Sequence, residues 1–183
     1  MCEVNKCIIP DKFPLPKINE LLSELRNANV FSQLDLASAY HQLALHPESR
    51  GLAAFITPDG VYQYRRVCFG LSSAPSAFQK MMTTILSGLT GVQCYLDDVI
   101  IWGHDQKEHD NNLRQVLERL SKYNVKLNQD KCKFSVSELK FLGHVISDKG
   151  IQVDDKHHAI TEASVPRDEK SLEIITWIGQ LFF

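Results

Sequence analysis

The chain has 183 residues, of which 44% are hydrophobic, so its length suits one domain with a substantial core. Twenty basic and 22 acidic residues give a formal charge of -2, so no global basic field indicates a nucleic-acid partner and any such surface must be local. The five cysteines show no C-x-x-C pair or zinc spacing, which indicates reduced thiols in an intracellular chain. No apolar stretch has the length of a membrane span, and the first residues lack the apolar core of a signal peptide, so we expect neither secretion nor a membrane.

The N-terminal part predicts an extended segment followed by a short helix. Residues 1–17 contain three prolines, which disfavour a helix or a central strand. Apolar residues then recur at helical spacing over residues 18–25, and Asn27 to Asn29 supplies a stop.

The next segment predicts a strand that ends in an acid. Residues 30–36 read as a strand whose odd-numbered and even-numbered side chains face opposite sides. Asp35 closes this apolar strand, where an acid is costly to place and often functional; an edge residue that points to solvent is the alternative. Residues 37–42 predict a tight helical turn, and residues 43–46 return to extended structure.

A hairpin and a long helix follow. Residues 52–57 and 61–67 predict two strands around a turn at residues 57–60, where Pro and Gly occupy favoured positions. Ser72 or Ser73 can then cap a helix with a proline in its first turn. Six apolar residues at helical spacing form a core-facing stripe on this helix: Phe78, Met81, Met82, Ile85, Leu86 and Leu89.

Two adjacent acids, Asp97 and Asp98, separate the apolar runs 92–96 and 99–102, which both predict buried strands. The spacing is that of a hairpin, although Asp-Asp is not the usual chemistry of a two-residue turn. Neighbouring carboxylates repel each other unless a cation or a donor neutralises them. Oxygen ligands without Cys or His suit magnesium, so the pair predicts a magnesium site and phosphoryl transfer. A solvated acidic turn is the alternative, which the flanking strands disfavour.

The last third predicts one more long helix and a short hairpin. Asp105 can cap an amphipathic helix that reaches Asn124. His104 and His109 are five positions apart, which is not zinc spacing on a helix, so we expect surface histidines. Residues 141–146 predict a strand, residues 147–150 a turn and residues 151–153 a second strand; residues 154–163 and 172–182 predict helices.

This order of elements predicts an α+β fold, in which an antiparallel sheet carries helices on one face. Several motifs then agree in order and spacing with one family. They are Pro14-Leu15-Pro16, Phe31-Ser32-Gln33-Leu34-Asp35-Leu36 through Tyr40-His41-Gln42, Phe69-Gly70-Leu71 through Phe78-Gln79, Tyr95-Leu96-Asp97-Asp98, Glu108-His109, Asn128 with Lys131-Cys132, and Phe141-Leu142-Gly143-His144. The chain resembles the reverse transcriptase of gypsy-type LTR retrotransposons.

This resemblance implies the palm of a right-hand polymerase with partial fingers over residues 1–153, and the start of a truncated thumb or connection over residues 154–183. It implies an RNA-directed DNA polymerase in which Asp35, Asp97 and Asp98 form the catalytic metal site. Asp35 and Asp97 would hold two Mg²⁺ ions, which Mn²⁺ could replace, and Asp98 would support the site electrostatically.

The resemblance also implies substrate-binding residues. Leu36, Tyr40 and Gln79 match the family's nucleotide-binding positions, and Tyr40 would exclude a 2′-hydroxyl; a buried core tyrosine is the alternative. Residues 142–144, Leu142, Gly143 and His144, match the primer-holding region, where Gly143 would permit close backbone approach. A plain strand bulge would look the same.

By the same resemblance, the partners are dNTPs, an RNA or DNA template with its primer, and the polyprotein regions that we expect to be missing from this chain: fingers strands, thumb or connection, RNase H and integrase. No membrane is implied, and the family works in cytoplasmic particles. The chain therefore reads as a fragment with little activity alone. The competing hypotheses are a catalytically inactive remnant that only binds nucleic acid or protein, and an RNA-dependent RNA polymerase, which Tyr40 and Tyr95 disfavour.

Overall fold

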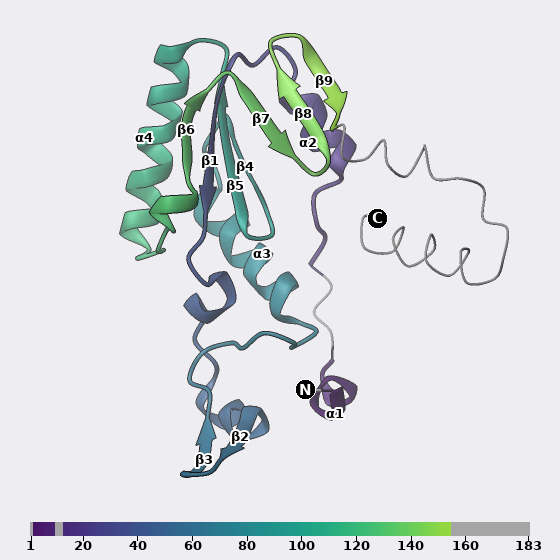
Figure 1. The fold of residues 1–183 in the computed structure, drawn as a ribbon. Coiled ribbons are helices and arrows are strands. Elements are labelled where there is room, and N and C mark those ends of the chain that lie inside the picture. The colour runs from purple at the N-terminus through teal and green to yellow at the C-terminus, as the bar shows by residue number, and fades with distance from the viewer. Residues whose placement is uncertain (1, 10–12, 155–183) are drawn as a thin grey trace, which may run out of the picture.

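The structure is a computed structural model that describes residues 2–9 and 13–154 (Figure 1). The predicted helices over residues 154–163 and 172–182 begin at the edge of this range or lie outside it. The described α-helices are α1 (Cys2–Cys7), α2 (Ile18–Glu24), α3 (Ala74–Leu86) and α4 (Gln106–Lys122), with 3-10 helices at Ala39–Gln42, Pro47–Ala53 and Gln129–Lys131. The described strands are β1 (Val30–Asp35), β2 (Ala54–Thr57), β3 (Gly60–Gln63), β4 (Val92–Tyr95), β5 (Asp98–Gly103), β6 (Lys133–Val136), β7 (Glu138–Phe141), β8 (His144–Ser147) and β9 (Gly150–Val153).

The main sheet is antiparallel and has the order β4-β5-β1-β6. Its central strands β1 and β5 contribute apolar side chains to both faces, because each face is covered by other elements. The predicted alternation of residues 30–36 is confirmed, since Phe31 belongs to the core on one face and Leu34 and Leu36 to the core on the other. This sheet holds the acids that the sequence analysis singled out.

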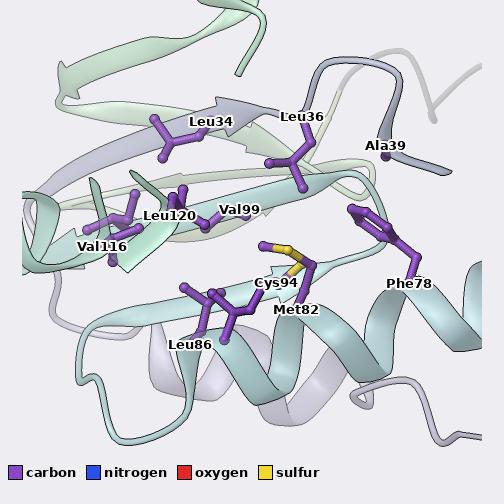
Figure 2. Close-up of a cluster of buried hydrophobic side chains, with 12 residues drawn as sticks. Leu34, Leu36, Ala39, Phe78, Met82, Leu86, Cys94, Val99, Val116 and Leu120 are labelled. Carbon is purple, nitrogen blue, oxygen red and sulfur yellow. The ribbon is translucent and has the colours of Figure 1, made fainter. Parts of the chain in front are cut away.

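Helices α3 and α4 cover one face of the sheet and enclose a first core cluster (Figure 2). Side chains of α3 point toward β1, β4 and β5, and the predicted apolar stripe lies on this side of the helix, except that Leu89 follows the end of α3 at Leu86. The buried residues of this first core cluster are Leu34, Leu36, Ala39, Phe78, Met82, Ile85, Leu86, Cys94, Val99, Ile101, Val116 and Leu120. The expected helix-covered face is therefore confirmed.

The opposite face carries a second core cluster, contributed by α2, by the strands of the main sheet and by the three-stranded sheet β7-β8-β9. Figure 1 shows α2 and this small sheet beside the main sheet, away from α4. The buried members are Leu21, Leu22, Leu25, Ala28, Phe31, Ile100, Trp102, Leu139, Phe141 and Ile146. The main sheet is thus buried on both faces, and the fold class is α+β as predicted.

The hairpin β2-β3 lies apart from the main sheet (Figure 1). Its turn was predicted correctly, but its strands are shorter than expected. Residues 52 and 53 belong to a 3-10 helix, and residues 65–67 are not part of β3, because their backbone pairs with residues 43–45 instead.

In the described part of the chain, no helix is long and apolar enough to cross a membrane.

Three further expectations about local structure were wrong. Residues 2–7 form helix α1, whose Asn5 amide bonds the backbone of Gly70 and Ser72, so a tertiary contact helps to fix a segment that was predicted to be extended. Residues 141–146 are not one strand, because a turn at Leu142 and Gly143 divides β7 from β8. Helix α4 begins after its Asp105 cap as predicted, but it ends at residue 122 rather than 124.

His109 was predicted to lie on the surface, but its side chain is fully buried. Its Nε2 atom lies 2.8 Å from the Ser32 hydroxyl of β1, which also accepts a hydrogen bond from the Ser135 amide of β6. The backbone of His109 packs closely against β5 because residue 103 is glycine: a Cβ atom at Gly103 would lie 2.7 Å from the Cα atom of His109. His104 is exposed, as expected.

Candidate active site

Asp35 and Asp98 lie opposite each other on the two central strands of the sheet. Asp35 is the last residue of β1 and Asp98 the first of β5, and they are direct partners in the antiparallel register. Directly opposite residues have Cβ atoms about 5 Å apart, so their side chains share one face at one end of the sheet. Both acids are half-buried. The fold therefore brings the end of β1 to the start of β5, next to Asp97.

The third acid, Asp97, lies in the turn between β4 and β5. Tyr95 pairs with Asp98, so the two turn residues are Leu96 and Asp97, whereas the sequence analysis had placed the turn at Asp97 and Asp98. Leu96 has a left-handed backbone with φ 52°, which is strained for a branched apolar residue and is typical of functional turns. The Leu36 amide donates to the Asp97 carbonyl over 3.2 Å, which ties this turn to the end of β1.

Gln79 of α3 holds the same turn from the helix-covered face. Its side chain is only 1% exposed. Its amide donates to the Cys94 carbonyl over 2.8 Å, and its carbonyl oxygen accepts from the Leu96 amide over 3.0 Å. Both polar ends of Gln79 are thus used on the hairpin backbone, and the predicted contact with an incoming nucleotide stays a prediction.

The electrostatics of the turn favour a cation. Burial, and then the charges of Asp98 and Asp35, raise the pKa of Asp97. Its Oδ1 atom is buried and has no hydrogen-bond partner among the described residues, which is costly for a carboxylate. The neighbouring Cys94 thiol is buried, and this burial together with the charges of Asp98 and Asp97 raises its pKa to about 12. A cation bound at the turn would remove this repulsion.

Asp98 lies in a better compensated environment than Asp97. Burial raises its pKa, but the side-chain amide of Gln33 donates to its Oδ1 atom over 3.1 Å, and this bond lowers the pKa. The nearby Asp35 charge raises it again, whereas Lys133 and Lys131 lower it. The strand pattern places Gln33 on the face of Asp35 but indicates no role for it, because a polar residue in a strand carries no signal of its partner.

The residues predicted to bind nucleotide gather at this end of the sheet. Leu36 follows Asp35, and its side chain is buried. Tyr40 is half-buried against Phe69 and Phe78, with ring centroids 5.3 and 5.8 Å away. Burial raises the pKa of Tyr40, and the charge of Asp97 raises it further, so the phenol lies close enough to the acidic turn for the two to interact electrostatically.

The predicted primer-holding residues form the turn between β7 and β8. Leu142 and Gly143 both have left-handed backbones, with φ 47° and 74°, and the His144 ring contacts the Leu142 carbonyl over 2.9 Å. The adjacent Phe141 ring packs edge-on against Tyr95, with centroids 6.1 Å apart. Since Tyr95 pairs with Asp98, the contact between Phe141 and Tyr95 connects the β7-β8 turn to the β4-β5 turn that carries Asp97.

The donor set fits a magnesium ion that is shared with a substrate. In residues 2–9 and 13–154, no three His, Cys, Asp or Glu side chains cluster closely enough to enclose a metal. Magnesium, however, commonly takes one or two carboxylates and completes its shell with water and substrate phosphates. Asp35 and the unpartnered Asp97 oxygen supply such a pair. Their chemistry suits an in-line displacement at a phosphate.

Comparisons with known proteins agree with this geometry. A family model described as "Reverse transcriptase (RNA-dependent DNA polymerase)" matches residues 3–146. The chain is 43% identical to the "Retrovirus-related Pol polyprotein from transposon 412" of Drosophila melanogaster over 92% of this chain and 14% of the relative. It is 35% identical to the "Transposon Tf2-3 polyprotein" of Schizosaccharomyces pombe over 92% of this chain and 13% of the relative. The chain thus spans a small part of the length of these relatives.

Solved structures support the same fold. A foamy viral protease-reverse transcriptase in complex with double-stranded DNA matches with a TM-score of 0.86 and 21% identity, over 97% of this chain and 32% of that chain. The same kind of viral protein in complex with an RNA/DNA hybrid matches with a TM-score of 0.82 and 21% identity, over 97% of this chain and 24% of that chain. These matches confirm the polymerase palm-like α+β fold.

Proposed function

Since this chain belongs to the reverse transcriptase family, we propose that it is the palm of an RNA-directed DNA polymerase from a gypsy-type LTR retrotransposon. It adds dNTPs to the 3′-hydroxyl of a primer on an RNA or DNA template. The observation that carries this proposal is that Asp35, Asp97 and Asp98 lie at one end of the sheet, where the buried Oδ1 atom of Asp97 has no hydrogen-bond partner in the part of the chain that the structure describes.

The three acids would have different roles at this site. Asp35 and Asp97 would hold two Mg²⁺ ions, with Mn²⁺ as a substitute, and Asp98 would add negative potential beside them. When bound, the metal ions supply activation of the primer hydroxyl and stabilisation of the leaving pyrophosphate. The protein fixes the positions of the carboxylates, because β1, β5 and Gln79 hold both the strand end and the turn. Preorganised charge of this kind needs little rearrangement during reaction.

Substrate contacts surround the acids. Tyr40 would lie beneath the incoming sugar and exclude a 2′-hydroxyl, and its position near Asp97 supports this role. Leu36 and Gln79 would complete the nucleotide site, Leu36 through its backbone next to Asp35 and Gln79 from the opposite side of the turn. Residues 142–144, Leu142, Gly143 and His144, would hold the primer strand, and the contact between Phe141 and Tyr95 supports their closeness to the acids.

The surrounding polyprotein would complete the enzyme. We propose that residues 1–153 form the palm with part of the fingers, and that residues 154–183 start a thumb or connection. The relatives are longer Pol polyproteins, and solved reverse transcriptases with this fold are described in complex with DNA or an RNA/DNA hybrid. A primer-template, dNTPs and further polyprotein regions are therefore the proposed partners.

Primer extension tests this function. We would measure Mg²⁺-dependent extension of oligo(dT) on poly(rA) by the 183-residue chain, by the chain joined to fingers and thumb segments of a relative, and by the Asp97→Asn variant of the joined protein. We expect extension by the joined protein, little by the chain alone and none by the variant. A folded joined protein that extends no primer would instead support a catalytically inactive remnant.

A further inference from the structure

Gln33 lies on the same face of β1 as Asp35, two residues earlier. Asp35 is directly opposite Asp98, so Gln33 and Asp98 are diagonal neighbours across the strand pair, a distance that a long side chain can span. The Gln33 Nε2 atom donates a hydrogen bond to Asp98 Oδ1 over 3.1 Å, and both residues are half-buried. This bond joins the two strands on the face that carries the acids.

Asp97 and Asp98 therefore lie in different surroundings. Asp98 receives a hydrogen bond from Gln33, and the positive charges of Lys131 and Lys133 act on it. Lys133 of β6 is also the register partner of Gln33, which places a cation beside the amide. The Oδ1 atom of Asp97, in contrast, is buried without a partner among the described residues.

From this contrast we infer that Gln33 is a positioning residue, which holds the carboxylate of Asp98 toward β1 and so leaves the cation position to Asp35 and Asp97. The inference rests on the proposed function, because it concerns the same acidic site. It adds a residue whose role is to keep a third carboxylate from joining the metal ligands. Since an amide is neutral, Gln33 can restrain Asp98 without cancelling the negative potential of the site.

Loss of this amide has a particular consequence. In Gln33→Leu, the Asp98 carboxylate loses its donor, so its oxygen becomes available to a divalent cation. We expect the affinity of the chain for Mn²⁺ to rise roughly threefold to tenfold, because one hydrogen bond no longer competes with the metal. In Gln33→Lys, a charged donor takes the place of the amide, and we expect the Mn²⁺ affinity to fall below that of the wild type.

The experiment measures free Mn²⁺ by electron paramagnetic resonance during titration of the full 183-residue chain. The proteins are the wild type, Gln33→Leu, Gln33→Lys and the control Gln63→Leu, which changes an exposed glutamine on β3. Thermal unfolding without metal is measured in parallel, because a merely structural role for Gln33 would change the melting temperature and leave the Mn²⁺ affinity unaltered.

We expect the Mn²⁺ affinities to follow the order Gln33→Leu above wild type above Gln33→Lys, with Gln63→Leu equal to the wild type. Equal affinities in all four proteins, a reversed order, or no saturable binding in any of them would overturn the inference. In the joined protein, Gln33→Leu should lower kcat with little change in the KM for dTTP. Failure of the proposed function is a separate result, namely no primer extension by the wild-type joined protein.

Discussion

Replacing Asp97 with asparagine should stabilise the chain while it removes a metal ligand. The side chains have nearly the same shape, so the substitution changes charge more than packing. In the wild type, burial and the charges of Asp98 and Asp35 raise the pKa of Asp97, which means that the fold disfavours its ionised form. The asparagine removes both repulsive contacts.

The size of the gain follows from these two contacts. A pair of charges that solvent partly screens is worth about 0.2–1 kcal/mol, so the Asp97→Asn variant, which loses two such repulsions, should gain about 1 kcal/mol at pH 7 and melt roughly 2–4 °C higher. Wild-type stability falls as the pH rises from the ordinary aspartate pKa of 3.8 through the raised folded-state pKa of Asp97. The advantage of the variant should therefore vanish below that window and be complete above it.

Thermal unfolding by circular dichroism, without divalent metal, would be compared at pH 7 and pH 3.5. Asp59→Asn is the matched control, because Asp59 is exposed in the turn between β2 and β3. We expect a higher melting temperature at pH 7 for Asp97→Asn alone. If Asp97→Asn melted at or below the wild-type temperature at pH 7, the unrelieved repulsion that we assign to the turn would be refuted.

Three further substitutions test other parts of the account. Gly103→Ala should destabilise the chain by about 1–3 kcal/mol, since its Cβ would crowd the His109 backbone. The control Gly51→Ala, whose Cβ meets open space, should change the melting temperature little. Equal effects of the two substitutions would contradict the packing argument. Gln79→Leu should cost about 2–3 kcal/mol in urea unfolding, because two buried backbone groups lose their partner; an unchanged midpoint would show that these bonds contribute nothing. Tyr40→Val should raise incorporation of rNTPs relative to dNTPs in the joined protein by roughly 10- to 100-fold, and an unchanged ratio would remove Tyr40 from the sugar site.

Much of the fold could be predicted because its central elements carry strong periodic patterns. The apolar stripe on α3 reflects burial against one layer, and the apolar residues of β1 reflect burial against a core on each face of the sheet, because burial dictates the spacing of apolar residues. Strands β6 and β7 were not predicted, because each has only four residues and so short an alternation of polar and apolar residues is a weak signal. Helix α1 was missed because contacts of Asn5 with distant backbone leave no local pattern.

The acids themselves were predictable, but their surroundings were not. Adjacent carboxylates between apolar strands are costly without a partner, and this conflict was visible in the sequence. The exact turn depended on the register of β4 and β5, which placed a left-handed backbone at Leu96. The donors at Gln33 and Gln79 became visible only with the fold, because each contacts a residue far away in the sequence.

The most direct measurement of the central claim is Mn²⁺ binding at the acidic site. It would compare the wild-type joined protein with its Asp35→Asn/Asp97→Asn double variant, in the presence of primer-template and a non-hydrolysable dTTP analogue. We expect two saturable ions in the wild type and their loss in the double variant, which nearly preserves the side-chain shapes and retains the neighbouring Asp98. Equal Mn²⁺ binding by the two proteins would contradict a metal site formed by Asp35 and Asp97.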